Sequence, residues 1–90
     1  MTHLDLLRSA VGKILLNDWD PVGVRDVAAA QDEYDQYVDP IVQMVVAGEP
    51  ASVLSRYLLG LEIKTMGLNG DRNRAQAIAE KLAHARALQR

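Results

Sequence analysis

The chain has 90 residues, of which 49% are hydrophobic and 24% charged, with a formal net charge of −2 and no cysteine. This size allows one domain with a single core, and the hydrophobic share is too high for a disordered segment. The lack of cysteine excludes disulfides and thiolate zinc sites, and the apolar stretches are too short to span a membrane. Because Asp5 and Arg8 do not fit a signal peptide, we expect a cytoplasmic protein.

The first predicted helix covers residues 2–17. If each residue turns the helix by about 100°, its apolar side chains fall within an arc of about 100°. These side chains are Leu4, Leu7, Val11, Ile14 and Leu15. Asn17 and Pro21 end the helix, and residues 18–27 form an ordered loop that carries Trp19.

The second predicted helix covers residues 27–47 and contains Pro40. Apolar residues continue across this proline at spacings of four, three and four, at Tyr34, Val38, Ile41 and Val45. The pattern favours one helix that is kinked at Pro40. The alternative is a new helix with Asp39 as its N-cap and Pro40 in its first turn.

The third and fourth predicted helices cover residues 51–66 and 72–88. The third helix is apolar on two sides, so it either lies centrally in the fold or faces a partner. Its second apolar side consists of Leu59, Ile63 and Met66. Gly67 fits the end of this helix, and Asp71 fits the N-cap of the next one.

Four helices and no strand predict an all-α fold, in which residues 1–90 form one compact domain that resembles a four-helix bundle. A loop that contains tryptophan joins the first two helices. The predicted core consists of Leu7, Val11, Ile14, Tyr34, Val38, Ile41, Val45, Leu54, Leu58, Leu61, Ile78 and Leu82.

Three short segments carry a family resemblance: WDPVGV at 19–24, DEYDQYVDPIV at 32–42 and EIKTMGL at 62–68. Over about Leu7 to Leu68 the chain resembles the YugE-like family of small bacterial all-helical proteins. The resemblance implies a helical fold. It implies no activity, because the motifs are aromatic, acidic and turn residues and the function of the family is unknown.

Charge is distributed unevenly along the chain. Residues 1–50 have nine acidic and three basic residues, whereas residues 51–90 have three acidic and seven basic ones. Seven carboxylates lie between Asp18 and Asp39, opposed only by Arg25. On a continuous helix, the side chains of Asp32, Asp35 and Asp39 would project within about 60° of one another.

This acidic segment has two interpretations. It is either a surface complementary to a basic protein or a solvated helix face whose acids are partly neutralised by the chain's own Arg and Lys residues. The candidate partner-binding residues are Asp18, Trp19, Asp20, Asp32, Glu33, Asp35, Tyr37 and Asp39.

Trp19 has two roles open to it. As an exposed side chain it would anchor a partner, because tryptophan dominates binding hot spots. We favour a buried plug that closes the core, with the indole N–H donated to a nearby carbonyl or carboxylate.

No motif indicates catalysis or a cofactor. The segment from Asp32 to Asp39 has no glycine-centred loop for Ca²⁺, and His3 and His84 have no histidine at metal-binding spacing, so we expect no metal. The serines lack the setting of a nucleophile elbow. The acidic half disfavours nucleic acid, since phosphates require a positive surface.

We therefore expect a non-catalytic protein-binding module, most concretely a bacterial immunity protein or antitoxin that blocks a basic, nuclease-like toxin. The alternative is a structural or regulatory homodimer that buries the second apolar face of the third helix, made by Leu59, Ile63 and Met66.

Overall fold

The computed structural model describes residues 3–85 and contains four α-helices in that range. They are α1 (His3–Lys13), α2 (Asp35–Val46), α3 (Ala51–Gly60) and α4 (Arg72–His84). α1 continues as a π-helix, η1 (Ile14–Trp19), and α3 continues as a second one, η3 (Leu61–Thr65). A short 3₁₀ turn, η2 (Ala28–Ala30), lies in the segment between η1 and α2.

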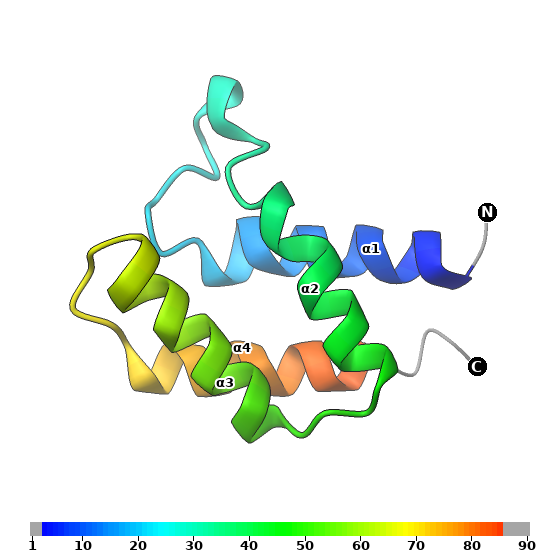
Figure 1. Ribbon diagram of the computed structural model, residues 1–90. Coiled ribbons are helices and arrows are strands. Elements are labelled where there is room, and N and C mark those ends of the chain that lie inside the picture. Colours follow the sequence, from blue (N-terminus) through cyan, green and yellow to red (C-terminus); the bar gives the residue numbers. More distant parts are fainter. Residues whose placement is uncertain (1–2, 86–90) are drawn as a thin grey trace.

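The helices pack in two pairs, α1 with α2 and α3 with α4, and η1 joins the pairs by packing against α4. In Figure 1, α1 and α4 run across the view while α2 and α3 cross it obliquely, and the segment between η1 and α2 projects from the body. The predicted all-α fold resembling a four-helix bundle is confirmed. None of the described helices is both long and apolar enough to cross a lipid bilayer.

Two predicted helix boundaries are wrong. The first helix extends through Trp19, which we expected in a loop. The second begins at Asp35 rather than at 27, because residues 20–34 use their polar groups within a separate loop described below. α2 then runs through Pro40 without interruption, so the alternative of a new helix starting at Asp39 is also wrong.

The later boundaries follow the prediction more closely. The third helix spans the expected range when η3 is included, and Gly67 follows it in the left-handed conformation at φ 70°. α4 begins at Arg72, where the Asp71 side chain accepts a hydrogen bond of 2.9 Å from the N–H of Arg74. Residue 2 and residues 86–88 of the predicted helices lie outside the described range.

The core joins all four helices. Nine of the twelve predicted core residues are buried, whereas Ile14, Val38 and Leu61 are only partly buried against the core. Leu15, Trp19 and Val42 are buried as well. The radius of gyration of 12.4 Å agrees with the value of about 12 Å typical of a compact domain of this length.

The two π-helices explain part of the core that we did not predict. Leu7, Val11, Leu15 and Trp19 are all buried at spacings of four residues. In an α-helix of 3.6 residues per turn, that spacing would rotate by about 40° at each step. Because the π-helix holds more residues per turn, it reduces this drift and keeps Leu15 and Trp19 on the core side in place of Ile14.

Candidate functional site

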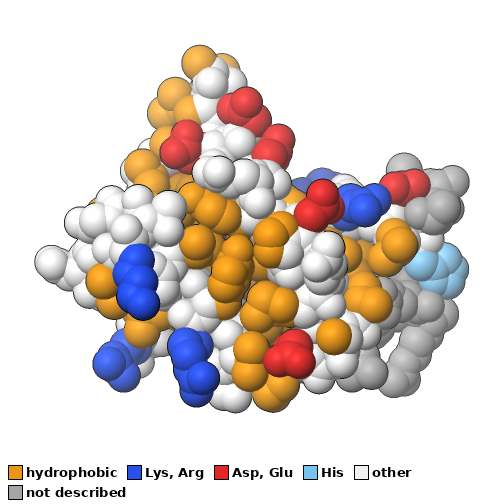
Figure 2. Space-filling model, in the orientation of Figure 1, with side chains coloured by type: hydrophobic (Ala, Val, Ile, Leu, Met, Phe, Trp, Pro, Cys, Tyr) orange, Lys and Arg blue, Asp and Glu red, His pale blue; other side chains and the backbone are white. Residues whose placement is uncertain are grey.

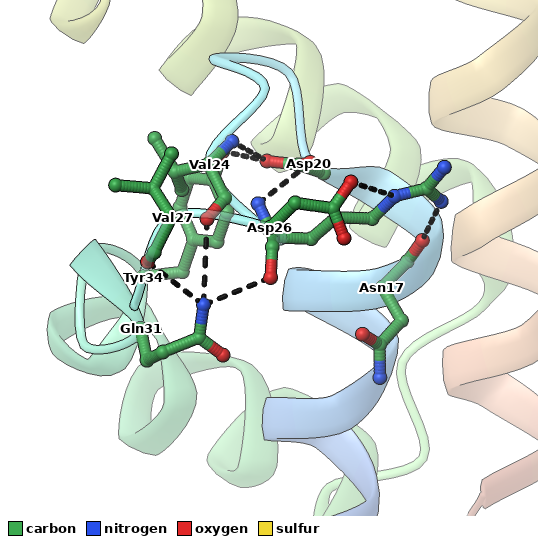
Figure 3. Close-up of polar contacts among 8 residues, drawn as sticks. Asn17, Asp20, Val24, Asp26, Val27, Gln31 and Tyr34 are labelled. Atoms are coloured by element: carbon green, nitrogen blue, oxygen red, sulfur yellow. Dashed lines mark hydrogen bonds and ion pairs between the residues drawn. The ribbon is translucent and has the colours of Figure 1, made fainter. Parts of the chain in front are cut away.

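Asp20 anchors the segment that projects from the body. It ends η1 in the left-handed conformation at φ 33° and ψ 57°, and its N–H donates to the carbonyl of Leu15 over 2.9 Å. Its carboxylate accepts hydrogen bonds from the N–H of Val24 at 2.7 Å, the N–H of Arg25 at 3.1 Å and the hydroxyl of Tyr34 at 2.7 Å. One side chain thus joins the beginning of the segment to its end (Figure 3).

Gln31 and Tyr34 hold the rest of this segment. The amide nitrogen of Gln31 donates to the carbonyls of Arg25 at 2.8 Å and Val27 at 3.0 Å, and the hydroxyl of Tyr34 accepts the N–H of Val22 at 3.1 Å. We call residues 20–34 the 20–34 loop. Side chains of the loop bind its own backbone, so it has a defined shape although it contains only one turn of regular structure.

The electrostatics of Asp20 and Tyr34 agree with this geometry. Partial burial alone would raise the pKa of Asp20, but the hydrogen bonds from Val24, Tyr34 and Arg25 outweigh it and lower the pKa below its ordinary value. Burial and the hydrogen bond to Asp20 raise the pKa of the Tyr34 hydroxyl. Near neutral pH the pair is therefore a carboxylate and a neutral phenol donor.

The 20–34 loop carries both aliphatic and acidic groups on its surface. Val22 and Val27 are each 48% exposed, and the side chain of Asp26 is 94% exposed. Figure 2 shows hydrophobic and acidic side chains together on the projecting part of the molecule. The 20–34 loop therefore presents exposed aliphatic groups and carboxylates on a segment that its own hydrogen bonds hold in shape.

The carboxylates at the base of the loop fall into two groups. Asp32, Glu33 and Asp35 are exposed and form no ion pair with any residue in the range 3–85. By contrast, Asp18 pairs with Lys81 at 3.4 Å. Three adjacent carboxylates without an ion pair to the described residues therefore lie at the end of the loop and the start of α2.

Asp39 belongs to the paired group. Its carboxylate accepts a hydrogen bond of 2.8 Å from Nε of Arg8, and this arginine also lies 3.6 Å from Asp5. Asp32 lies in the turn before α2, so our expectation that Asp32, Asp35 and Asp39 share one helix face is wrong. Residues 31–34 form a turn rather than helix because the side chains of Gln31 and Tyr34 form hydrogen bonds with other residues of the loop, and α2 begins directly after them.

Trp19 is a buried plug and not a surface anchor. It is 1% exposed, and its indole N–H donates to the carboxylate of Glu62 over 2.9 Å. Its ring lies 5.4 Å from that of Tyr34 and 6.4 Å, edge to face, from that of Tyr37. Trp19 therefore packs beneath the loop. Of the two tyrosines that contact its ring, Tyr34 is buried and Tyr37 is partly exposed.

Asp20 is also removed from the set of free surface acids. All three hydrogen bonds that its carboxylate accepts come from residues of the loop, so the role of this side chain in the structure is to hold the loop in shape. Four of the eight predicted partner-binding residues could therefore bind a partner while the side-chain contacts of the structure stay intact. They are Asp32, Glu33, Asp35 and, through its exposed part, Tyr37.

Glu62 is the main residue that we missed. It is fully buried in η3, where one carboxylate oxygen binds Trp19 and the other accepts from the N–H of Asp71 at 3.1 Å and from Arg74 at 2.7 Å. Glu62 thus connects the two π-helices to α4. Its position four residues after the buried Leu58 is the only sequence signal that could have indicated its burial.

The second apolar face of the third helix is partly covered. Leu59 and Met66 are partly buried against the core, whereas Ile63 is 46% exposed. The turn at Gly70 packs closely on Leu59 and Ile63, since a Cβ at Gly70 would lie 2.9 Å from Cδ1 of Leu59. The chain's own turn therefore occupies part of the face that we proposed for a homodimer.

No protein-family model matches the chain, and no curated protein or solved structure is significantly similar to it. The YugE-like resemblance therefore stays a prediction. Within residues 3–85, no group of three or more His, Asp or Glu side chains is placed to hold a metal ion.

Proposed function

We propose that this chain is a non-catalytic protein-binding module, most concretely a bacterial immunity protein or antitoxin that acts in the cytoplasm and blocks a basic, nuclease-like toxin. The observation that carries the proposal is the 20–34 loop, which is held by its own hydrogen bonds, projects from the helices and combines exposed aliphatic side chains with unpaired carboxylates.

The rigidity of the loop supports binding. A long loop without regular structure is usually either functional or disordered, and the hydrogen bonds of Asp20 and Gln31 argue against disorder here. A surface that is ordered before it meets its partner loses less conformational entropy on binding. The loop is therefore suited to recognise a partner without refolding.

The chemistry of the loop supports a basic partner. Asp32, Glu33 and Asp35 would accelerate encounter with a cationic surface and discriminate against acidic ones. Val22 and Val27 provide apolar contacts that charge alone does not supply, in place of the buried Trp19.

The test is isolation of the partner from the native host, followed by binding measurements with the purified pair. We expect the double variant Asp32→Lys and Asp35→Lys to weaken binding at least about tenfold, which corresponds to about 1.4 kcal/mol. Affinity of the unchanged protein should fall as added salt shortens the Debye length below about 10 Å.

Glu49→Lys with Glu80→Lys is the matched control, because it changes the net charge equally at sites outside the loop. Binding should remain within about threefold in this control. Equal weakening in both double variants, or a purified partner that binds the Asp32→Lys and Asp35→Lys variant as well as the original, would contradict the proposal. Circular dichroism establishes that each variant keeps its helices.

The homodimer is a second and weaker proposal. The 46% exposure of Ile63 favours it, but Leu59 and Met66 are already partly buried within the chain. Of these three side chains only Ile63 is exposed, so it would supply most of the apolar surface that a symmetric dimer buries on this face.

A further inference from the structure

A groove with unpaired arginines runs along the outer side of α3 and α4. It consists of two adjoining hollows of about 500 and 560 Å³, which share Leu59 and Arg72 in their walls. Arg56 belongs to the first hollow and Ile63 to the second. We call this the α3–α4 groove.

The groove has a definite chemical character. Arg56 and Arg72 are exposed and pair with no carboxylate among residues 3–85. Leu59 and Ile63 are apolar lining residues, and Ser55 and Gln76 supply neutral hydrogen-bonding groups. The carboxylate of Asp71, which accepts the N–H of Arg74, also lines the second hollow, so the groove as a whole holds two arginines and one carboxylate. An occupant that fits would present carboxylates beside small aliphatic side chains.

The 20–34 loop has this composition. Asp32 and Glu33 are unpaired carboxylates, and Val22 and Val27 are the exposed aliphatic groups beside them. In Figure 1 the loop projects from the body on the side away from α3 and α4, so it does not lie in the groove of its own chain. A second copy can bring the two surfaces together.

We propose that the 20–34 loop of one copy docks in the α3–α4 groove of a second copy, head to tail. This inference rests on the loop surface of the proposed function and gives that surface a second partner. Because the two sides of the contact are different, repeated docking builds an open chain of copies, or a ring where the rotation between copies closes. A basic partner that binds the loop would compete with the groove for it and would therefore separate the associated copies.

Sedimentation velocity of the whole protein tests the inference. The average mass should rise with concentration between about 10 μM and 1 mM, a range typical of small, weak interfaces, and should fall as salt is added. Two neutral variants remove one side each: Asp32→Asn with Glu33→Gln in the loop, and Arg56→Gln with Arg72→Gln in the groove. Each variant alone should sediment as a monomer over the same range.

An equimolar mixture of the two variants provides the decisive result. The intact loop of the groove variant fits the intact groove of the loop variant, so the mixture should form a dimer that grows no further. Glu49→Gln with Glu80→Gln is the matched control and should associate like the original protein. A monomeric mixture would overturn the inference, as would an original protein that stays monomeric throughout or a dimer that neither variant weakens.

The same variants separate this inference from the proposed function. Binding of the basic partner should weaken in the loop variant and stay unchanged in the groove variant. If the loop variant binds the partner more weakly and the groove variant binds it normally, while the original protein never self-associates, head-to-tail docking is wrong and the proposed function stands. If self-association behaves as expected but no variant changes partner binding, the proposed function is wrong and head-to-tail docking stands.

Discussion

At the scale of single residues, Asp20 shows how one side chain determines a surface that it does not itself form. Its left-handed backbone ends η1, a conformation that aspartate tolerates better than most residues. Its carboxylate then fixes Val24, Arg25 and Tyr34. The exposed acids and valines of the loop depend on this arrangement for their positions.

Asp20→Asn tests this role, because asparagine keeps the left-handed backbone but loses the charge. The amide NH₂ of asparagine would face one of the N–H donors that now bind a carboxylate oxygen, and that donor would lose its acceptor. We therefore expect the free energy of unfolding to fall by about 1–3 kcal/mol at neutral pH. Urea denaturation measures this change. Asp32→Asn is the control at an exposed, unpaired carboxylate and should change stability by less than about 0.5 kcal/mol.

Because the pKa of Asp20 is lowered in the folded protein, the stability difference between the original protein and Asp20→Asn depends on pH. The ordinary pKa of the group is 3.8 and the folded value lies below it, so on acidification the unfolded chain takes up the proton first. The stabilisation by Asp20 is complete above about pH 5 and is lost as the pH falls through the folded pKa. The difference in the free energy of unfolding between the original protein and Asp20→Asn should therefore decrease below about pH 4. A difference that increases there would contradict the role of the Asp20 carboxylate in holding the loop.

Residue roles were predictable where the partner is local in the sequence. Asp71 is the N-cap of α4, as predicted, and its side chain binds the N–H of Arg74, three residues later in the sequence. The indole of Trp19 binds a carboxylate, as a buried tryptophan in a small domain should, but that carboxylate lies 43 residues further on. The buried Glu62 was not predicted, because nothing local indicates that Trp19, Asp71 and Arg74 would converge on it.

At the scale of elements, the π-helical ends of the first and third helices have a shared consequence. Trp19 lies in η1 and Glu62 in η3, and the hydrogen bond between them joins the two segments. The apolar periodicity at 100° per residue predicted both helices but not their change from α-helix to π-helix. It therefore placed Ile14 rather than Leu15 in the core. The start of α2 was misplaced because the side-chain contacts of the 20–34 loop compete with helix formation.

Pro40 tests α2 as an element. It lies inside the helix with its side chain exposed, and it has no N–H to donate to the carbonyl of Gln36. Pro40→Ala restores that donor, and we expect a gain of about 1–2 kcal/mol after the greater freedom of the unfolded chain is subtracted. Thermal unfolding measures the gain, with Gln43→Ala as the exposed control in the same helix. A loss of stability would mean that the proline geometry is needed to place the start of α2.

At the scale of the whole molecule, the uneven charge of the sequence becomes a spatial separation. Asp32 and Glu33, which form no ion pair with the described residues, lie in the 20–34 loop, whereas the unpaired Arg56 and Arg72 line the α3–α4 groove. The sequence predicted this polarity and the helical class from composition and periodicity alone. It predicted an ordered loop over residues 18–27 but not the extension of the loop to Tyr34, because that extension depends on the contact between Asp20 and Tyr34, which forms only after the chain has turned back.

The packing of the two helix pairs predicts how the molecule unfolds. Leu58 is fully buried in α3, in the core cluster that joins all four helices. Leu58→Ala should therefore lower the free energy of unfolding by about 2–5 kcal/mol, through lost burial and the cavity that remains. In a domain of this size each kcal/mol lowers the melting temperature by about 4–8 °C.

Leu6→Ala is the matched control, since it removes the same atoms from a side chain that is 44% exposed. Its effect should stay near or below about 1 kcal/mol, because much of that side chain is already in water. Both variants should unfold in a single transition seen alike by helical circular dichroism and by the fluorescence of Trp19, because η1 joins the two pairs through α4. Separate transitions for the two signals would show that the pairs unfold independently, and equal losses in the two variants would show that Leu58 does not lie at the centre of the core.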